Sequence, residues 1–195
     1  MFAALLDTCV LWPSLQRDFL LSLAIEGLYR PVWNTVILDE LAYEERAKLI
    51  NRGADASTAT RRANHLVAQM RRHFDDAEVN GWEGLDGTYG LPDPDDEHLV
   101  AAAAVGGAGA IVTHNLRDLP ASKMPYGLQV LPPTEFAANT VALDPTRAWA
   151  ALTTIAGRSG RTGQPRTEAQ ILDLLDSRYG MKEAVDLMLE ASAGG

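Results

Sequence analysis

Short apolar runs alternate along this chain with longer stretches whose apolar residues recur at helical spacing, and this alternation constrains the fold most. Residues 3–6, 29–33, 110–113 and 128–131 are apolar and short enough to be strands. The stretches at residues 14–26, 34–50, 57–74 and 93–106 lie between these runs and are expected to be helices. Strands that alternate with helices are typical of a parallel sheet with helices on both faces. The sequence therefore predicts an α/β fold, a parallel-sheet α/β/α sandwich.

The pattern changes near residue 140, after a short capped segment at residues 133–138. Beyond it only helical patterns remain: Pro145 suits a first helical position, and Thr167 with Gln170 resembles a capping box. The glycine-rich stretch at residues 157–165 is typical of a flexible joint. We therefore expect two domains, residues 1–140 with the sheet and residues 141–195 as a helical C-terminal appendage.

Composition limits the class of protein and its compartment. Hydrophobic residues make up 47% of the chain and charged residues 22%, as in ordinary globular proteins. No apolar run approaches the length needed to cross a bilayer, and the apolar N-terminus carries Asp7 and lacks a basic leader. Cys9 is the single cysteine, so no intrachain disulfide can form and a reducing compartment is favoured. We expect a cytoplasmic protein with no membrane partner.

The net charge of −9 bears on nucleic-acid binding. Proteins that hold nucleic acid mostly by neutralising phosphates tend to be basic, so this chain needs bound cations and a local basic patch if RNA is its substrate. Arg61, Arg62 and Arg72 share one face of the predicted helix at residues 57–74. This stripe is either a grip on phosphates or a solvated helix face.

Carboxylates stand where a parallel sheet keeps its ligand site. Asp7 directly follows the first predicted strand, Asp118 lies in the loop after residues 110–113, and Asp96 belongs to a group of acids that opens a helix. Glu40 lies in the second turn of the helix that begins near residue 34. Ligands of open parallel sheets bind beyond the carboxyl ends of the strands. Converging carboxylates there would suit Mg²⁺ or Mn²⁺.

Most of these acids also have a structural explanation. Asp93 beside Pro94 can be an N-cap, with the acids that follow favoured by the helix dipole. Glu40 can belong to a solvated helix face, and Asp118 can be a turn residue. Asp7 is different, because an acid at the end of a buried strand is costly to desolvate.

Four segments, in order and at their intervals, resemble the PIN-domain family and most closely its VapC-like branch: LLDTCVLWP, RPVWNTVILDEL, LPDPDDEHLVAAAA and AIVTHNLRDLP. They span about residues 5–120, and the helical tail is similar to the C-terminal extension of some members of that branch. The resemblance implies a PIN-like fold and an Mg²⁺- or Mn²⁺-dependent endoribonuclease. It also implies the toxin of a type II toxin–antitoxin pair.

The resemblance also assigns roles to residues. Asp7, Glu40 and Asp96 match the family's acids, and Thr113 matches the threonine that ends the later strand. Many members have an aspartate two residues after that threonine, where this chain has Asn115. Asp118 is the nearest substitute, so the metal and catalytic set is Asp7, Glu40, Asp96 and Asp118. Thr8, Asp93, Thr113 and Asn115 are expected to position these acids or the substrate.

The expected partners are single-stranded or structured RNA, a cognate antitoxin protein and a second copy of the chain as a homodimer. Two alternatives remain open. A PIN-like domain that only binds RNA or protein would explain Asn115. A receiver-like or dehalogenase-like phosphotransfer domain fits less well, because Cys9 stands where the latter needs an acid and the paired acids of the former are missing.

Overall fold

The computed structural model describes residues 1–160 and 164–193, and their contacts form two compact units. The sheet unit comprises residues 3–12 and 31–130, and the helical unit comprises residues 1–2, 13–30 and those from 131 onward. Residues 13–30 therefore belong with the C-terminal helices, so these units do not follow a single cut at residue 140. A separate domain of residues 1–140 stays a prediction.

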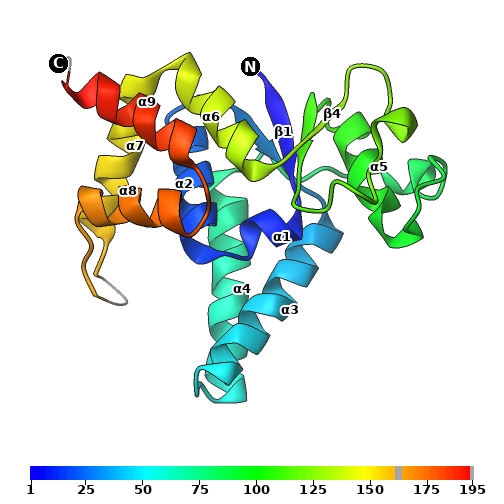
Figure 1. Ribbon diagram of the computed structural model, residues 1–195. Helices are drawn as coiled ribbons and strands as arrows, with labels where there is room; N and C mark the ends of the chain where they lie inside the picture. The colour runs from blue at the N-terminus through cyan, green and yellow to red at the C-terminus, as the bar shows by residue number, and fades with distance from the viewer. Residues whose placement is uncertain (161–163, 194–195) are drawn as a thin grey trace. The chain divides into compact units, whose positions relative to one another are not determined.

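A four-stranded sheet is the centre of the fold, in the order β2-β1-β3-β4. The strands are β1 (Ala3–Leu6), β2 (Arg30–Val32), β3 (Ala110–Val112) and β4 (Gln129–Leu131). The central pair β1 and β3 is parallel and completely buried, with Leu5 opposite Ile111. Helices flank this parallel sheet and further helices follow it, which confirms the predicted fold class (Figure 1).

Helix α5 (Glu97–Val105) packs against both central strands. It ends at Gly106, where an added Cβ would lie 2.7 Å from a methyl carbon of Val79 and 2.9 Å from one of Val32. Such distances are far below van der Waals contact, so only glycine lets the end of α5 approach the sheet this closely.

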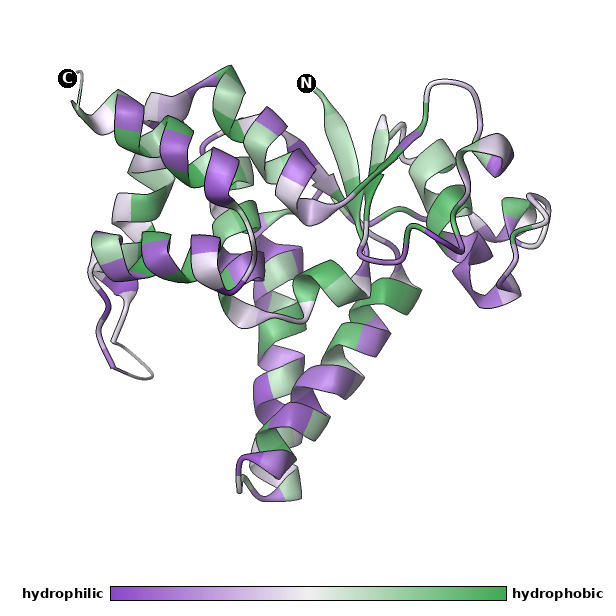
Figure 2. Cartoon of the chain, in the orientation of Figure 1, coloured by the Kyte–Doolittle hydropathy of each residue, from purple (hydrophilic) through white to green (hydrophobic). Residues whose placement is uncertain are grey.

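Helices α3 (Thr35–Asn51) and α4 (Ala56–His73) pack against each other as a hairpin that extends away from the sheet (Figure 1). Asn34 caps α3 by accepting a hydrogen bond from the amide of Ile37, as the sequence indicated, and Asp55 caps α4 through Thr58. The central strands β1 and β3 are hydrophobic, whereas many residues of the hairpin are hydrophilic (Figure 2).

Three short elements were not predicted. Helix α1 (Thr8–Leu11) follows β1 directly, and the 3₁₀ turns η1 (Glu83–Leu85) and η3 (Ala121–Lys123) lie in segments expected to be loops. The predicted helix at residues 93–106 is divided into the 3₁₀ turn η2 (Pro94–Asp96) and α5.

The helical unit contains α2 (Ser14–Ile25), α6 (Pro133–Leu143), α7 (Pro145–Arg158), α8 (Glu168–Ser177) and α9 (Lys182–Ala193). Helix α7 packs on α2 and α9, and α6 packs on α9. Pro145 occupies the first turn of α7 and Thr167 forms the predicted capping box with Gln170. Residues 161–163 of the predicted joint lie outside the described residues.

In the part of the chain that the structure describes, no helix combines the length and the apolar character that a membrane span requires.

Candidate active site

Asp7 lies between the ends of the two central strands. Its amide donates a hydrogen bond to the carbonyl of Val112, which continues the pairing of β1 with β3 past the end of β1. The hydroxyl of Thr113 donates to Oδ2 of Asp7 over 2.6 Å, and Thr113 is fully buried. The parallel sheet thus fixes the position of this carboxylate through both backbone and side chain.

Glu40 approaches from the second turn of α3. Its Oε2 accepts a hydrogen bond of 2.6 Å from the hydroxyl of Thr8, the residue after Asp7. Glu40 is exposed, and it lines an open hollow of about 410 Å³ together with Thr8, Tyr43 and the neighbouring acids Asp39 and Glu44. The predicted positioning role of Thr8 is consistent with this contact.

Asp96 comes from η2, at the start of α5. Its Oδ2 accepts a hydrogen bond of 3.0 Å from the side-chain amide of Asn115, whose own backbone amide donates to Thr113. Asp93 caps η2 by accepting from the amide of Asp95, which agrees with its structural explanation. Asn115 therefore donates a hydrogen bond to Asp96 from a neutral amide. A carboxylate at position 115 would instead have repelled the carboxylate of Asp96.

The four acids Asp7, Glu40, Asp96 and Asp118 share one electrostatic environment. Burial and then the negative charge of Asp7 raise the pKa of Asp96 from 3.8 to about 6, and Asp93, Asp118 and Glu40 add to this rise. Acids far apart in sequence therefore lie near enough to oppose ionisation of Asp96. Asp118 contributes to this group through its charge.

Cys9 contacts the site without acting as a nucleophile. Its thiol donates to Oδ2 of Asp7 over 3.0 Å and lies 3.5 Å from the hydroxyl of Thr113. Burial, followed by the charge of Asp7, raises the pKa of the Cys9 thiol to about 12. The thiol is therefore protonated at neutral pH and serves as a hydrogen-bond donor to Asp7.

His98 and Glu97 support the site from inside the fold. His98 is buried against Trp82 and contacts the side-chain amide of Asn34 over 3.1 Å, so it packs rather than ligates. Glu97 was not identified from the sequence. Its buried carboxylate accepts from the amides of Tyr89 and Leu91, and thereby anchors the loop that precedes Asp96. Burial raises the pKa of Glu97, but these backbone hydrogen bonds outweigh it and the net shift is downward.

The fit of a divalent cation depends on the donors and on their charge. Within residues 1–160 and 164–193, no three His, Cys, Asp or Glu side chains form a group ready to hold a metal ion. The four acids nevertheless offer hard oxygen donors, and no ion pair in these residues neutralises any of them. A bound cation would offset the repulsion that the neighbouring acids exert on Asp96. This set of oxygen donors therefore fits Mg²⁺ or Mn²⁺.

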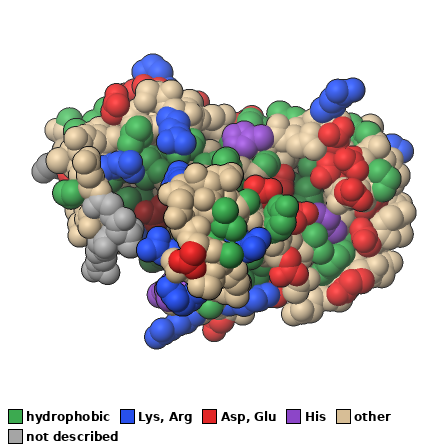
Figure 3. Space-filling view, turned by 90° about the horizontal axis from the view of Figure 1, so that it is seen from below, with side chains coloured by type: hydrophobic (Ala, Val, Ile, Leu, Met, Phe, Trp, Pro, Cys, Tyr) green, Lys and Arg blue, Asp and Glu red, His purple; other side chains and the backbone are tan. Residues whose placement is uncertain are grey.

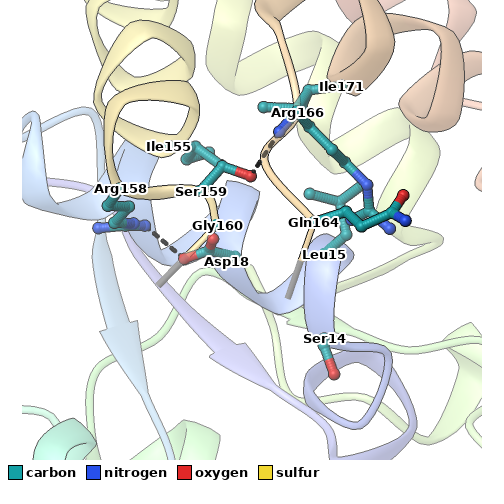
Figure 4. Close-up of a pocket in the computed structure, with 10 residues that line it drawn as sticks. All are labelled: Ser14, Leu15, Asp18, Ile155, Arg158, Ser159, Gly160, Gln164, Arg166 and Ile171. Atoms are coloured by element: carbon teal, nitrogen blue, oxygen red, sulfur yellow. Dashed lines mark hydrogen bonds and ion pairs between the residues drawn. The ribbon is translucent and has the colours of Figure 1, made fainter. Parts of the chain in front are cut away.

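Another hollow, of about 400 Å³, lies within the helical unit (Figure 4). Arg158 forms an ion pair with Asp18 at its wall, and the backbone amide of Arg166 donates to the hydroxyl of Ser159. The acid and base at this hollow neutralise each other, and it contains none of the predicted site residues.

Comparison with known families gives one match: the model of the PIN domain matches residues 3–117, more than half of the chain. The matched stretch contains Asp7, Glu40, Asp96 and Asn115 and ends just before Asp118. No curated protein and no solved structure showed a significant match.

Proposed function

The chain belongs to the PIN-domain family, whose members are generally nucleases, and on this premise we propose that it is a metal-dependent endoribonuclease. Its substrate would be single-stranded or structured RNA, and its reaction the hydrolysis of a phosphodiester bond by an activated water.

One observation carries this proposal: burial and the charges of Asp7, Asp93, Asp118 and Glu40 together raise the pKa of Asp96. Acids with a purely structural role are normally neutralised by a base or kept apart, whereas these neighbours repel each other. Functional sites commonly keep such unfavourable arrangements because the ligand or the reaction requires them.

Residues of this chain would hold and orient the reacting groups. Asp7, Glu40 and Asp96 would hold a divalent ion, which when bound supplies an activated water and positive charge beside the phosphate. Thr113 and Cys9 both donate to Oδ2 of Asp7 and so hold this carboxylate in place. Thr8 holds Glu40 in the same way, which fixes the acids before substrate arrives.

The amide of Asn115 supports a second candidate function, a PIN domain that binds RNA or protein with weak catalysis or none. Asn115 already occupies Oδ2 of Asp96, and a neutral amide attracts a cation less than the carboxylate found there in many relatives. Calorimetric titration with Mn²⁺ separates the two functions, because a domain without catalysis has no need of a tight cation site.

The biological role follows from the VapC-like resemblance and the helical extension. We propose a cytoplasmic toxin of a type II toxin–antitoxin pair, inhibited by a cognate antitoxin and able to form a homodimer. Adjacent coding sequence offers a direct check. A short reading frame for a DNA-binding partner, whose co-expression relieves growth arrest, would support this role, and growth unaffected by the protein alone would contradict it.

The activity itself is tested with purified protein and a labelled single-stranded RNA. Cleavage is expected with Mg²⁺ or Mn²⁺ and not in EDTA, and Asp7→Asn should abolish it. Asp173→Asn is a matched control, because Asp173 is an exposed acid of the helical unit. Full cleavage in excess EDTA, or by Asp7→Asn, would refute the proposed mechanism.

A further inference from the structure

The exposed face of α4 carries three arginines, Arg61, Arg62 and Arg72, which are called the basic stripe below. Ala63, Val67 and Met70 are buried on the opposite side of the helix. At the spacing of an α-helix, Arg61 and Arg72 lie on one line, with His65 between them, and Arg62 lies beside this line, about a quarter of a turn away. The three arginines span about 16 Å along the helix axis.

No ion pair of the described residues involves the basic stripe. Arg61 donates a hydrogen bond to the hydroxyl of Thr58, which leaves its positive charge unneutralised. By contrast, Arg71 of the same helix is held bidentately by Glu78. In a chain with a net charge of −9, three unneutralised arginines on one face are a local exception. Figure 3 shows several Lys and Arg side chains on one face of the molecule, with Asp and Glu side chains among and beside them.

A structural explanation accounts for part of this pattern only. Basic residues in the last turn of a helix interact favourably with its dipole, and Arg72 and His73 lie there. Arg61 and Arg62 lie in the first half of α4, where the dipole gives them no advantage. The stripe as a whole therefore needs another reason.

The last turn of α4, which carries Arg72, lies near the start of α3, which carries Glu40. The two helices pack against each other as a hairpin. The charge of Asp39, the residue before Glu40, adds to the rise in the pKa of Arg71 that the hydrogen bond with Glu78 causes. An anionic chain held along α4 would consequently lead toward Glu40.

We propose that the basic stripe Arg61, Arg62 and Arg72 binds the phosphates of single-stranded RNA and guides the strand along the hairpin to the four acids. This deepens the proposed function and rests on it for the identity of the substrate. RNA fits better than an acidic protein, because its phosphates repeat along the strand and can meet arginines that are spread over about 16 Å of the helix. The stripe supplies locally the positive charge that the chain as a whole lacks.

The test is binding of a fluorescein-labelled single-stranded RNA to the full chain, measured by anisotropy in EDTA so that no cleavage is required. The variant is Arg62→Gln/Arg72→Gln, since both side chains are exposed and neither forms an ion pair among the described residues. The control is Arg166→Gln/Arg178→Gln, which removes the same charge from exposed positions of the helical unit. Each phosphate contact contributes about 0.7 to the slope of log K against log salt for a single strand.

The stripe variant should therefore lose about 1.4 of that slope, and its Kd should rise about tenfold or more near 50 mM salt. The control should match the parent protein, and both variants should melt like it. A stripe variant with the parental slope and Kd would overturn the proposal. So would a control that loses as much affinity, or tighter stripe-dependent binding to phosphatidylserine vesicles than to RNA. Stripe-dependent RNA binding without cleavage in Mn²⁺ would refute the nuclease function alone and uphold the stripe.

Discussion

Asp96→Asn should stabilise the metal-free protein. The ionised carboxylate of Asp96 is opposed by burial and by the charges of Asp7, Asp93, Asp118 and Glu40. An asparagine of the same shape is neutral, so the repulsion disappears, and its carbonyl can still accept the hydrogen bond from Asn115. The free energy of unfolding in EDTA at pH 7.5 should therefore increase.

The size of this gain follows from the pKa of Asp96, which rises from 3.8 to about 6. At about 1.36 kcal/mol per pKa unit the full penalty is about 3 kcal/mol. Asp96 is only partly buried, so solvent screening reduces the expected gain to about 1–2 kcal/mol. The pKa of Asp96 is higher in the folded state than in the unfolded state, so ionisation of Asp96 lowers the free energy of unfolding. This loss is absent below pH 3.8, grows as the pH rises to about 6 and is complete above that.

The assay is thermal melting in EDTA at pH 7.5 and pH 5, with about 2–4 °C expected per kcal/mol for a chain of this size. The advantage of Asp96→Asn should fall by roughly half at pH 5, where part of the parental carboxyl is already protonated in the folded state. Asp55→Ala is the contrasting control: its hydrogen bonds to Ser57 and Thr58 lower the pKa of Asp55, so losing that cap should lower the melting temperature. If Asp96→Asn melts below the parent at pH 7.5, or its advantage does not depend on pH, the four acids do not repel as argued.

Three further outcomes are expected at the same site. Asp118→Asn should reduce RNA cleavage strongly and Asn115→Ala less, since only Asp118→Asn removes a charged oxygen ligand. If Asn115→Ala lowered kcat more than Asp118→Asn, Asp118 would not belong to the catalytic set. Thr113→Val should lower kcat because Asp7 loses its 2.6 Å donor, whereas Thr113→Ser should retain most of it; equal losses would indicate a packing role. An inhibiting antitoxin should place an Arg or Lys side chain among the four acids. A structure of the complex in which every basic residue of the antitoxin lies far from Asp7 would contradict this.

The fold was predictable where a local pattern determines the outcome. The buried run at residues 3–6 is β1 as predicted, and Asn34, Pro145 and Thr167 occupy the helix-end positions that their side chains favour. The grouping of α2 with the C-terminal helices was not predictable. The spacing of apolar residues shows that a helix has an apolar face, but it does not show which distant helix packs against that face.

The convergence of the acids could be anticipated because parallel strands end at one edge of the sheet. Thr113 donates to Asp7 at this edge. The catalytic and metal-binding roles of the acids and the positioning role of Thr113 stay predictions. Glu97 could not be recognised, because its sequence context matches that of the exposed acids before it. Only the fold shows that its carboxylate is buried and caps backbone amides.

The contact between Asp7 and Thr113 also has a consequence for synthesis. These residues are 106 positions apart, so a ribosome making about 5–20 residues per second adds Thr113 roughly 5–20 s after Asp7. Until β3 has been made and paired with β1, the first acid lacks both the backbone and the hydroxyl that hold it. A nascent or truncated chain that ends before β3 therefore cannot assemble this centre, and the protein has no such site until more than half of its 195 residues have been made.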